Sequence, residues 1–334
     1  MTIPRSIQID LSATLYYHCM ARCVRRAHLC GQDYQTGQDY SHRKHLIVAR
    51  IKQLASIFAI QICAYAVMSN HYHLVLCVID QDAHSWDDEA VISRWQQLFS
   101  KDAKAISTYS KQEAEYKIAL WRRRLMDISW FMRCLNETIA RSFNREDSTK
   151  GRFWEGRFKS QALLDEGAIL SAMAYVDLNP IRAKIAETPE ASDFTSIQDR
   201  IKLLAKQLKG ENSIEKICNT AMQPQHLMPF ANNRVNSSKI AAIDFSLYDY
   251  LQLIDSTGRI IREDKRGAIP ENIAPILTRL DLNARTCMSM VKNLQNSFSY
   301  AIGHTDVLMN FCSQHRRHSP KGLSTARQCY IAVA

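Results

Sequence analysis

The hydrophobic and polar positions in the first eighty residues switch between the period of a strand and that of a helix. Residues 14–24 are β-prone, whereas apolar residues between 42 and 58 recur at helical spacing. Two short apolar runs, 64–68 and 74–79, then flank turn residues, which predicts a β-hairpin. Because strand, helix, strand and strand open a ferredoxin-like sandwich, we expect an α+β fold with an antiparallel sheet.

Helical patterns dominate the remainder of the chain. A charged insertion at 101–127 separates two predicted helices, and a short strand at 160–164 precedes a helix over 165–179 that ends before Pro180. The other predicted helices are 86–99, 128–143, 196–209, 246–256, 271–280, 284–295 and 306–315. We therefore predict a domain of residues 1–190 and a mainly helical C-terminal extension, 191–334, with an irregular segment at about 210–240.

Composition adds a preference for a polyanionic partner. Lys and Arg total 43 against 33 for Asp and Glu, which gives a formal net charge of +10. This charge does not distinguish DNA from RNA. The ten cysteines contain no C-x-x-C pair and are typical of reduced, buried residues. Without an apolar run suited to a signal peptide or a membrane span, we expect a cytoplasmic protein that does not bind membranes.

Two histidines at the start of the second hairpin strand are candidate metal ligands. Successive side chains of a strand point to opposite faces, so His71 and His73 share a face while Tyr72 points away. Two imidazoles roughly 7 Å apart can converge on one cation. His18 can approach from a neighbouring strand, although we do not expect it to be a ligand. The alternative, that both histidines are hydrogen-bonded structural residues, stays open on this pattern.

A tyrosine and an asparagine one helical turn apart form a second candidate group. Tyr175 and Asn179 lie at i and i+4 of the predicted helix. An amide oxygen from Asn179 can complete a His71, His73 and Asn179 set suited to Mg²⁺ or Mn²⁺. Because a free phenol has a pKa of about 10, Tyr175 needs such a metal to attack a phosphate near neutral pH.

Cations alternate with aromatic residues in the segment 151–159. This interleaving suits nucleic acid, because cations contact phosphates while rings stack on unpaired bases. The alternative is a loop whose rings fill the core below a solvated charged rim. The candidate DNA-binding residues, together with the basic end of the first strand, are Arg22, Arg25, Arg26, Arg152, Trp154, Arg157 and Lys159.

Three segments in this order resemble the REP-associated tyrosine transposases, which belong to the single-tyrosine HUH transposases of insertion sequences. The segments are 67–75 (VMSNHYHLV), 151–154 (GRFW) and 174–183 (AYVDLNPIRA). The resemblance covers roughly residues 10–190. It implies a ferredoxin-like HUH endonuclease domain that cleaves and rejoins single-stranded DNA, often beside a hairpin.

The resemblance also implies roles for individual residues. His71 and His73 would hold a divalent metal, with Asn179 completing the coordination. Tyr175 would attack a DNA phosphate to give a 5′-phosphotyrosine and a free 3′-hydroxyl. Rejoining would need no nucleotide cofactor, because the covalent intermediate keeps the energy of the broken bond. A homodimer is a further expectation.

The chain departs from the short members of that family in two places. The insertion around 101–127 puts hairpin recognition in doubt, and the segment after about 190 has no counterpart. That segment contains basic groups, which suit either phosphate contacts or a solvated surface: Arg259, Arg262, Lys265 and Arg266, and residues 315–318. Two alternative functions are a catalytically inactive or domesticated sequence-specific DNA-binding regulator, and a metal hydrolase that uses water.

Overall fold

A five-stranded sheet with the order β2-β3-β1-β4-β5 forms the centre of the computed structural model. Its first four strands are antiparallel neighbours, whereas β5 pairs with β4 in parallel. The strands are β1 (Tyr16–Arg22), β2 (Ile60–Val67), β3 (His71–Val78), β4 (Lys159–Leu163) and β5 (Ala301–Ile302). The structure describes residues 8–24, 30–32, 37–207, 218, 222–231, 241–261, 298, 300–315 and 321–330.

The register of the sheet gathers polar residues on one of its faces. His18 of β1 lies opposite Gln161 of β4, and Met20 lies opposite His73 of β3. Directly opposite residues of antiparallel strands point to the same face, as do residues two apart on one strand. His18, Gln161, His71 and His73 therefore share one face of the sheet.

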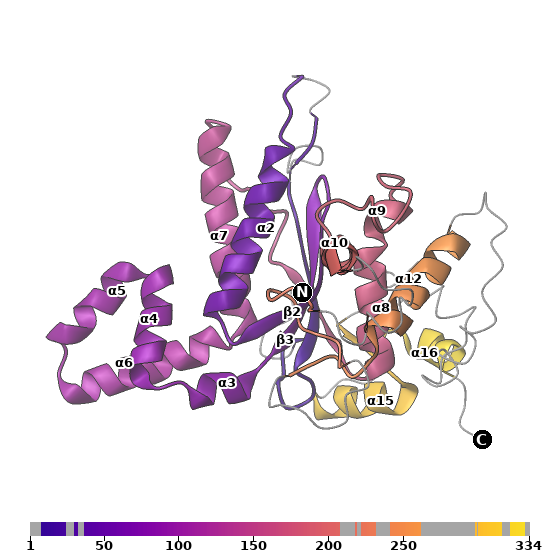
Figure 1. Cartoon of the computed structure of the whole chain (residues 1–334). Coiled ribbons are helices and arrows are strands. Elements are labelled where there is room, and N and C mark those ends of the chain that lie inside the picture. The colour runs from indigo at the N-terminus through magenta and orange to yellow at the C-terminus, as the bar shows by residue number, and fades with distance from the viewer. Residues whose placement is uncertain are drawn as a thin grey trace.

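Helices cover the two faces of the sheet (Figure 1). On one side lie α2 (His42–Ile57) and α7 (Ile128–Glu146), where the Tyr72 hydroxyl donates a 2.6 Å hydrogen bond to Asn136 of α7. The buried Arg43 side chain of α2 pairs with Glu146 and Asp147 at the end of α7. The other side is covered by α8 (Glu166–Asp177), whose Tyr175 ring contacts His73 of β3.

The segment between β3 and α7, which includes the insertion at 101–127, is a helical arm that projects from the sheet (Figure 1). The arm comprises α3 (Asp80–Ser85), α4 (Asp88–Leu98), α5 (Ser100–Lys104), the 3₁₀-helix η1 (Ala105–Thr108) and α6 (Lys111–Leu125). Trp95 of α4 stacks on Trp121 of α6 with 5.5 Å between ring centroids, and it also contacts Trp130 of α7. This aromatic cluster attaches the arm to the body of the molecule.

The N-terminus of α8 is held by residues from the end of the chain. Asp165 caps the helix by accepting a 2.8 Å hydrogen bond from the Ala168 N–H. It also accepts bonds from the His304 N–H (2.7 Å) and the Tyr330 hydroxyl (2.9 Å). A Cβ at Gly303 would lie 2.9 Å from the Asp165 carboxylate, so this close approach requires glycine.

The other end of α8 is held by a second buried carboxylate. Asp177 accepts hydrogen bonds from the Ser196 hydroxyl, the Ile197 N–H (3.0 Å) and the Tyr250 hydroxyl (2.7 Å). These donors belong to the first turn of α10 (Ser196–Gln207) and to α12 (Leu247–Ile261). Burial raises the pKa of Asp177 to about 6, although the Ser196 and Tyr250 donors lower it. Two acidic side chains thus join α8 to segments beyond residue 190.

Most predicted elements are present within a few residues of their expected bounds. The strands and the helices that begin near 42, 86, 128, 165, 196, 246 and 306 are confirmed, and α15 (Thr305–Gln314) and α16 (Leu323–Cys329) lie near the end of the chain. The predicted helices 271–280 and 284–295 fall outside the described residues. The division at residue 190 stays a prediction. No helix in the described part of the chain is long and apolar enough to cross a membrane.

One predicted helix boundary was wrong. The sequence predicted one helix through Asn179, but α8 ends at Asp177 and a separate short helix, α9 (Asn179–Arg182), begins at Asn179. Pro180 explains the break, because it has no N–H to donate to the carbonyl of Val176, four residues earlier.

We predict that Tyr250→Phe destabilises the protein, and more so at high pH. The Tyr250 hydroxyl lowers the pKa of Asp177, so its loss raises that pKa further above the ordinary value of 3.8. A carboxyl with a raised folded-state pKa destabilises the fold as pH rises through that value. Denaturant unfolding should show a loss of about 1.5–3 kcal/mol near pH ~8 and a smaller loss near pH ~4.

Tyr248→Phe, on the same helix but half-buried, is the matched control and should change stability little at either pH. An equal loss for Tyr250→Phe at both pH values would contradict an ionised Asp177 as the partner of Tyr250.

Candidate active site

The start of β3 and the end of α8 bring two histidines and a tyrosine together. The turn at Ser69 and Asn70 places His71 and His73 at the mouth of β3, with 4.9 Å between their ring centroids. The Tyr175 ring lies edge-on to His73, with a centroid distance of 5.4 Å. Residues about one hundred positions apart in the sequence are thus in contact across the sheet and helix layers.

His71 is held by its neighbour in the turn. Its Nδ1 lies 2.5 Å from the Asn70 amide oxygen, so Nδ1 carries the proton in this contact and Nε2 presents a lone pair. Burial lowers the pKa of His71 to about 4, and the cation of Arg22 on the neighbouring strand adds to this effect. His71 is therefore neutral at physiological pH, as a metal ligand must be.

His73 is part of a buried hydrogen-bonded series. Its Nδ1 lies 3.0 Å from Nε2 of His18, and Nδ1 of His18 lies 2.9 Å from Oε1 of Gln161. Burial holds the pKa of His73 well below its usual range and lowers that of His18 to about 4. Nε2 of His73 is buried and has no hydrogen-bond partner among the described residues. This orphaned nitrogen is an available ligand atom.

Tyr175 is buried beneath a cation. The side chain is 6 % exposed, and the Arg182 guanidinium carbon lies 4.5 Å from the centre of its ring. Arg182 and Arg22 also contribute to the low pKa of His73 through their charges. Two cations beside neutral imidazoles favour an anion at this place. Our interpretation of the sequence did not include Arg182 in the site, although it follows Tyr175 by about two helical turns.

Asn179 lies close to Tyr175 in the sequence but on a different helix. It is the first residue of α9 and is 7 % exposed. Its backbone oxygen accepts a 3.0 Å hydrogen bond from the Ala183 N–H. Its place as a metal ligand stays a prediction.

The residues present fit a divalent cation in part. Two neutral imidazoles with available Nε2 atoms are suitable nitrogen ligands. Among the described residues, however, no three His, Cys, Asp or Glu side chains are arranged to hold an ion. Amide, phosphate and water oxygens are suitable further ligands for such an ion.

The segment 151–159 separates its aromatic from its charged residues. Phe153 is buried, and the Trp154 ring contacts Tyr72 edge-on while its Nε1–H donates a 3.0 Å bond to the Asn136 carbonyl. The exposed cations of this segment are Arg152, Arg157 and Lys159. This arrangement favours the alternative in which the rings fill the core. A Trp154 ring that packs on Tyr72 and donates a hydrogen bond to Asn136 is not free to stack on a base.

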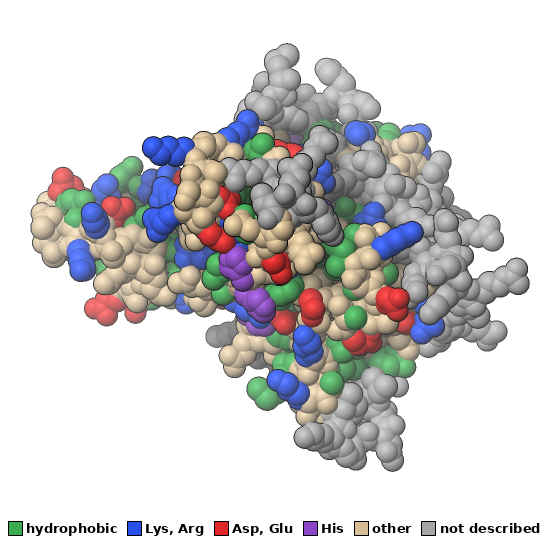
Figure 2. Space-filling model, turned by 90° about the horizontal axis from the view of Figure 1, so that it is seen from above, with side chains coloured by type: hydrophobic (Ala, Val, Ile, Leu, Met, Phe, Trp, Pro, Cys, Tyr) green, Lys and Arg blue, Asp and Glu red, His purple; other side chains and the backbone are tan. Residues whose placement is uncertain are grey.

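The other predicted DNA-binding residues are only partly described. Arg22 is exposed at the end of β1, opposite His71. Arg25 and Arg26 lie outside the described residues, as do Arg262, Lys265 and Arg266 and residues 316–318. On the face seen in Figure 2, the described basic side chains are interspersed with acidic ones, and histidines reach the surface.

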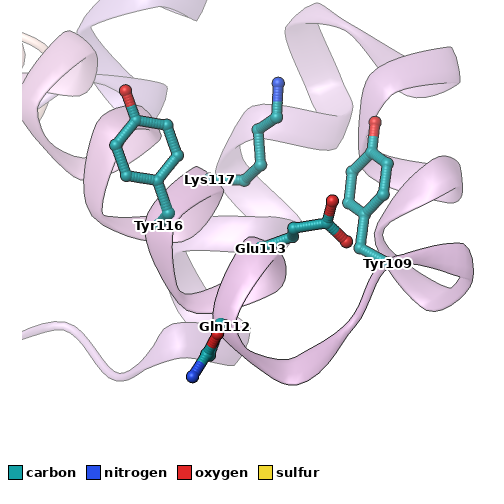
Figure 3. Close-up of a pocket in the computed structure, with 5 residues that line it drawn as sticks. All are labelled: Tyr109, Gln112, Glu113, Tyr116 and Lys117. Atoms are coloured by element: carbon teal, nitrogen blue, oxygen red, sulfur yellow. The ribbon is translucent and has the colours of Figure 1, made fainter.

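A pocket of about 240 Å³ lies on the helical arm, away from β3 and α8 (Figure 1). It is lined by Tyr109, Gln112, Glu113, Tyr116 and Lys117. Figure 3 shows the two tyrosine hydroxyls on the same side as the Lys117 amine, while Gln112 points away. None of the predicted site residues contributes to this pocket.

Comparisons with known proteins found one weak likeness. No family model and no curated protein matches the chain. A solved structure described as the "Structure of the REP associates tyrosine transposase bound to a REP hairpin" is similar at 11 % identity and a TM-score of 0.35, covering 66 % of this chain and 93 % of that one. A likeness of this size carries no functional weight, so function has to be inferred from the site residues.

We predict that Trp154→Ala destabilises the fold by about 3 kcal/mol, because it removes a half-buried ring and its hydrogen bond. Lys159→Gln, at an exposed position of the same segment, should change stability by less than about 0.5 kcal/mol. Denaturant unfolding of both variants tests this difference. A stable Trp154→Ala variant with weakened single-strand binding would instead support a stacking role.

Proposed function

We propose that the protein is a DNA transposase or single-strand endonuclease that cleaves and rejoins single-stranded, hairpin-associated DNA through Tyr175. The observation that carries this proposal is the contact between Tyr175 and His73, whose Nε2 is buried without a described partner. A phenol beside neutral imidazoles and two cations is suited to attack a phosphodiester. The three sequence segments that resemble REP-associated tyrosine transposases point to the same chemistry.

The fold supports a ferredoxin-like endonuclease domain of HUH type within residues 1–190. The strands β1 to β4 are antiparallel neighbours in the order β2-β3-β1-β4, with α2 between β1 and β2 and α7 before β4. A strand, helix, strand, strand, helix, strand sequence with this order is the ferredoxin-like arrangement. We propose that the segment after 190 is an addition that buttresses α8.

The reaction we propose is a transesterification. The Tyr175 oxygen attacks the phosphorus of the scissile phosphodiester, and a bond forms between them as the bond from phosphorus to the 3′-oxygen breaks. The phenolic proton passes to solvent, and the leaving 3′-oxygen takes up a proton to become a hydroxyl. Attack by a 3′-hydroxyl on the phosphotyrosine reverses these steps and rejoins the strand.

The cations of the site would bind the phosphate. Arg182 already contacts the Tyr175 ring, and Arg22 lies across the strand pair from His71. A guanidinium binds phosphate oxygens and stabilises the charge that develops on them. Because Arg182 lies beside Tyr175 and Arg22 lies opposite His71, a phosphate held between them would be within reach of the phenol.

We propose that His71, His73 and Asn179 hold Mg²⁺ or Mn²⁺. When bound, the cation would polarise a phosphoryl oxygen and lower the barrier to attack. The imidazoles are suited to this because both are neutral, and Nε2 of His73 has no competing partner among the described residues. A homodimer stays a prediction.

Tyr175→Phe should abolish formation of a covalent protein–DNA adduct, because phenylalanine has no oxygen to attack phosphorus. The wild-type protein, incubated with single-stranded hairpin DNA and Mn²⁺, should give an adduct that migrates slowly on a denaturing gel. Tyr248→Phe is the matched control and should form the adduct normally. Adduct formation by Tyr175→Phe would remove this residue from its proposed role, and cleavage without any adduct would indicate a water-using hydrolase.

His73→Ala should reduce Mn²⁺-dependent cleavage by more than ~100-fold while DNA binding is largely retained. The reason is that the substitution removes a ligand atom but leaves Arg22 and Arg182 in place. His45→Ala, which alters a histidine on α2 that contacts Phe194, is the control. Retained metal-dependent cleavage in His73→Ala would contradict the assignment, whereas metal-independent DNA binding without cleavage by the wild type would favour a DNA-binding regulator.

A further inference from the structure

Three buried polar side chains form a row across the sheet behind the candidate active site. Gln161 of β4, His18 of β1 and His73 of β3 are 7 %, 2 % and 1 % exposed, respectively. Because so little of these side chains is exposed, most of their polar atoms need partners within the protein. The hydrogen bonds of the row are therefore coupled to one another.

We infer that Gln161 and His18 are positioning residues that fix the tautomer of His73 so that its Nε2 faces the site with a free lone pair. This inference concerns how the proposed metal ligand is prepared, so it rests on the proposed function.

The Gln161 end of the row determines which atoms donate and which accept along it. Oε1 of Gln161 can only accept, so Nδ1 of His18, 2.9 Å away, carries the proton. A neutral imidazole has one donor and one acceptor, which leaves Nε2 of His18 as an acceptor. It therefore accepts the proton of Nδ1 of His73 at 3.0 Å, and Nε2 of His73 is left unprotonated.

The geometry of the two rings agrees with this assignment. Their planes differ by 17° and their centroids are 5.2 Å apart, as expected for two imidazoles joined edge to edge. His18 also lies next to the Tyr175 ring, with 5.8 Å between centroids, so its ring is enclosed between the sheet and α8. This packing limits rotation of the His18 ring, which would otherwise break both hydrogen bonds.

The same tautomer is set for His71 by a different partner. The Asn70 amide oxygen accepts from Nδ1 of His71, which leaves Nε2 of that ring free as well. The same ring nitrogen, Nε2, thus keeps its lone pair in both histidines. A turn residue sets the tautomer of His71, and the buried row sets that of His73. Partners of this kind orient metal ligands, and their loss costs about 10–100-fold in metal affinity.

Nitrogen NMR of the metal-free wild-type protein tests the tautomer directly. We expect the ¹⁵N shifts of His73 to show a protonated Nδ1 and an unprotonated Nε2. A protonated Nε2 would mean that the Gln161 amide faces the other way, and the inference would be overturned. This measurement requires neither DNA nor activity, and it remains decisive even where a variant fails to fold.

Variants at position 18 test the consequence for metal binding. His18→Phe keeps an aromatic ring at this position but removes both hydrogen bonds, so Mn²⁺ affinity measured by electron paramagnetic resonance should fall by about 10–100-fold. His18→Gln can still donate to Gln161 and accept from His73, so it should restore affinity close to the wild type. Met20→Leu, on the same strand, is the packing control.

The outcomes separate this inference from the proposed function. Equal Mn²⁺ affinity in the wild type and in a folded His18→Phe variant would overturn the positioning role while leaving Tyr175 as the nucleophile. Failure of His18→Gln to restore affinity would also overturn it. Loss of the covalent adduct from the wild type, with the expected tautomer and Mn²⁺ binding present, would instead overturn the proposed reaction and leave the positioning role standing.

Discussion

The burial of polar side chains on an otherwise apolar sheet is the constraint on which the candidate site depends. His18 and His73 lie where water cannot reach them, so they have to be neutral and hydrogen-bonded to neighbours. The antiparallel register provides those neighbours, because it places Gln161 directly opposite His18. One nitrogen, Nε2 of His73, has no hydrogen-bond partner among the described residues, and the His73 ring contacts Tyr175 of the overlying helix.

The helix that carries the tyrosine is held at both ends by carboxylates. Asp165 binds donors from His304 and Tyr330 near the end of the chain, and Asp177 binds donors from α10 and α12. The C-terminal segments therefore determine where α8 sits, even though they contribute no described residue to the site itself. A fixed helix keeps the phenol near the histidines, and reactive groups depend on such positioning for efficient chemistry.

The loop at 151–159 has a sequence pattern that fits two different structures. Alternating cations and aromatics indicate nucleic-acid binding when the rings are exposed, but the same alternation also fits a loop with a buried edge. The sheet resolves this ambiguity, because Cys23 forms a bridge with Trp154 and directs its ring toward Tyr72. The cations remain outside, where long-range attraction of a polyanion does not require ordered contacts.

Local pattern alone predicted the strands β1 to β4, the helices that begin near 42, 86, 128, 165, 196, 246 and 306, and the shared face of His71 and His73. These features depend on the period of two in a strand and of 3.6 in a helix, which are written in the sequence. Only the tertiary structure decided which partners those residues have. Gln161 and His18 meet through strand pairing across 143 positions, Arg182 reaches Tyr175 after a break at Pro180, and Asp177 caps a helix nineteen residues later. Contacts of this kind depend on register and packing between distant segments, and no local periodicity encodes them.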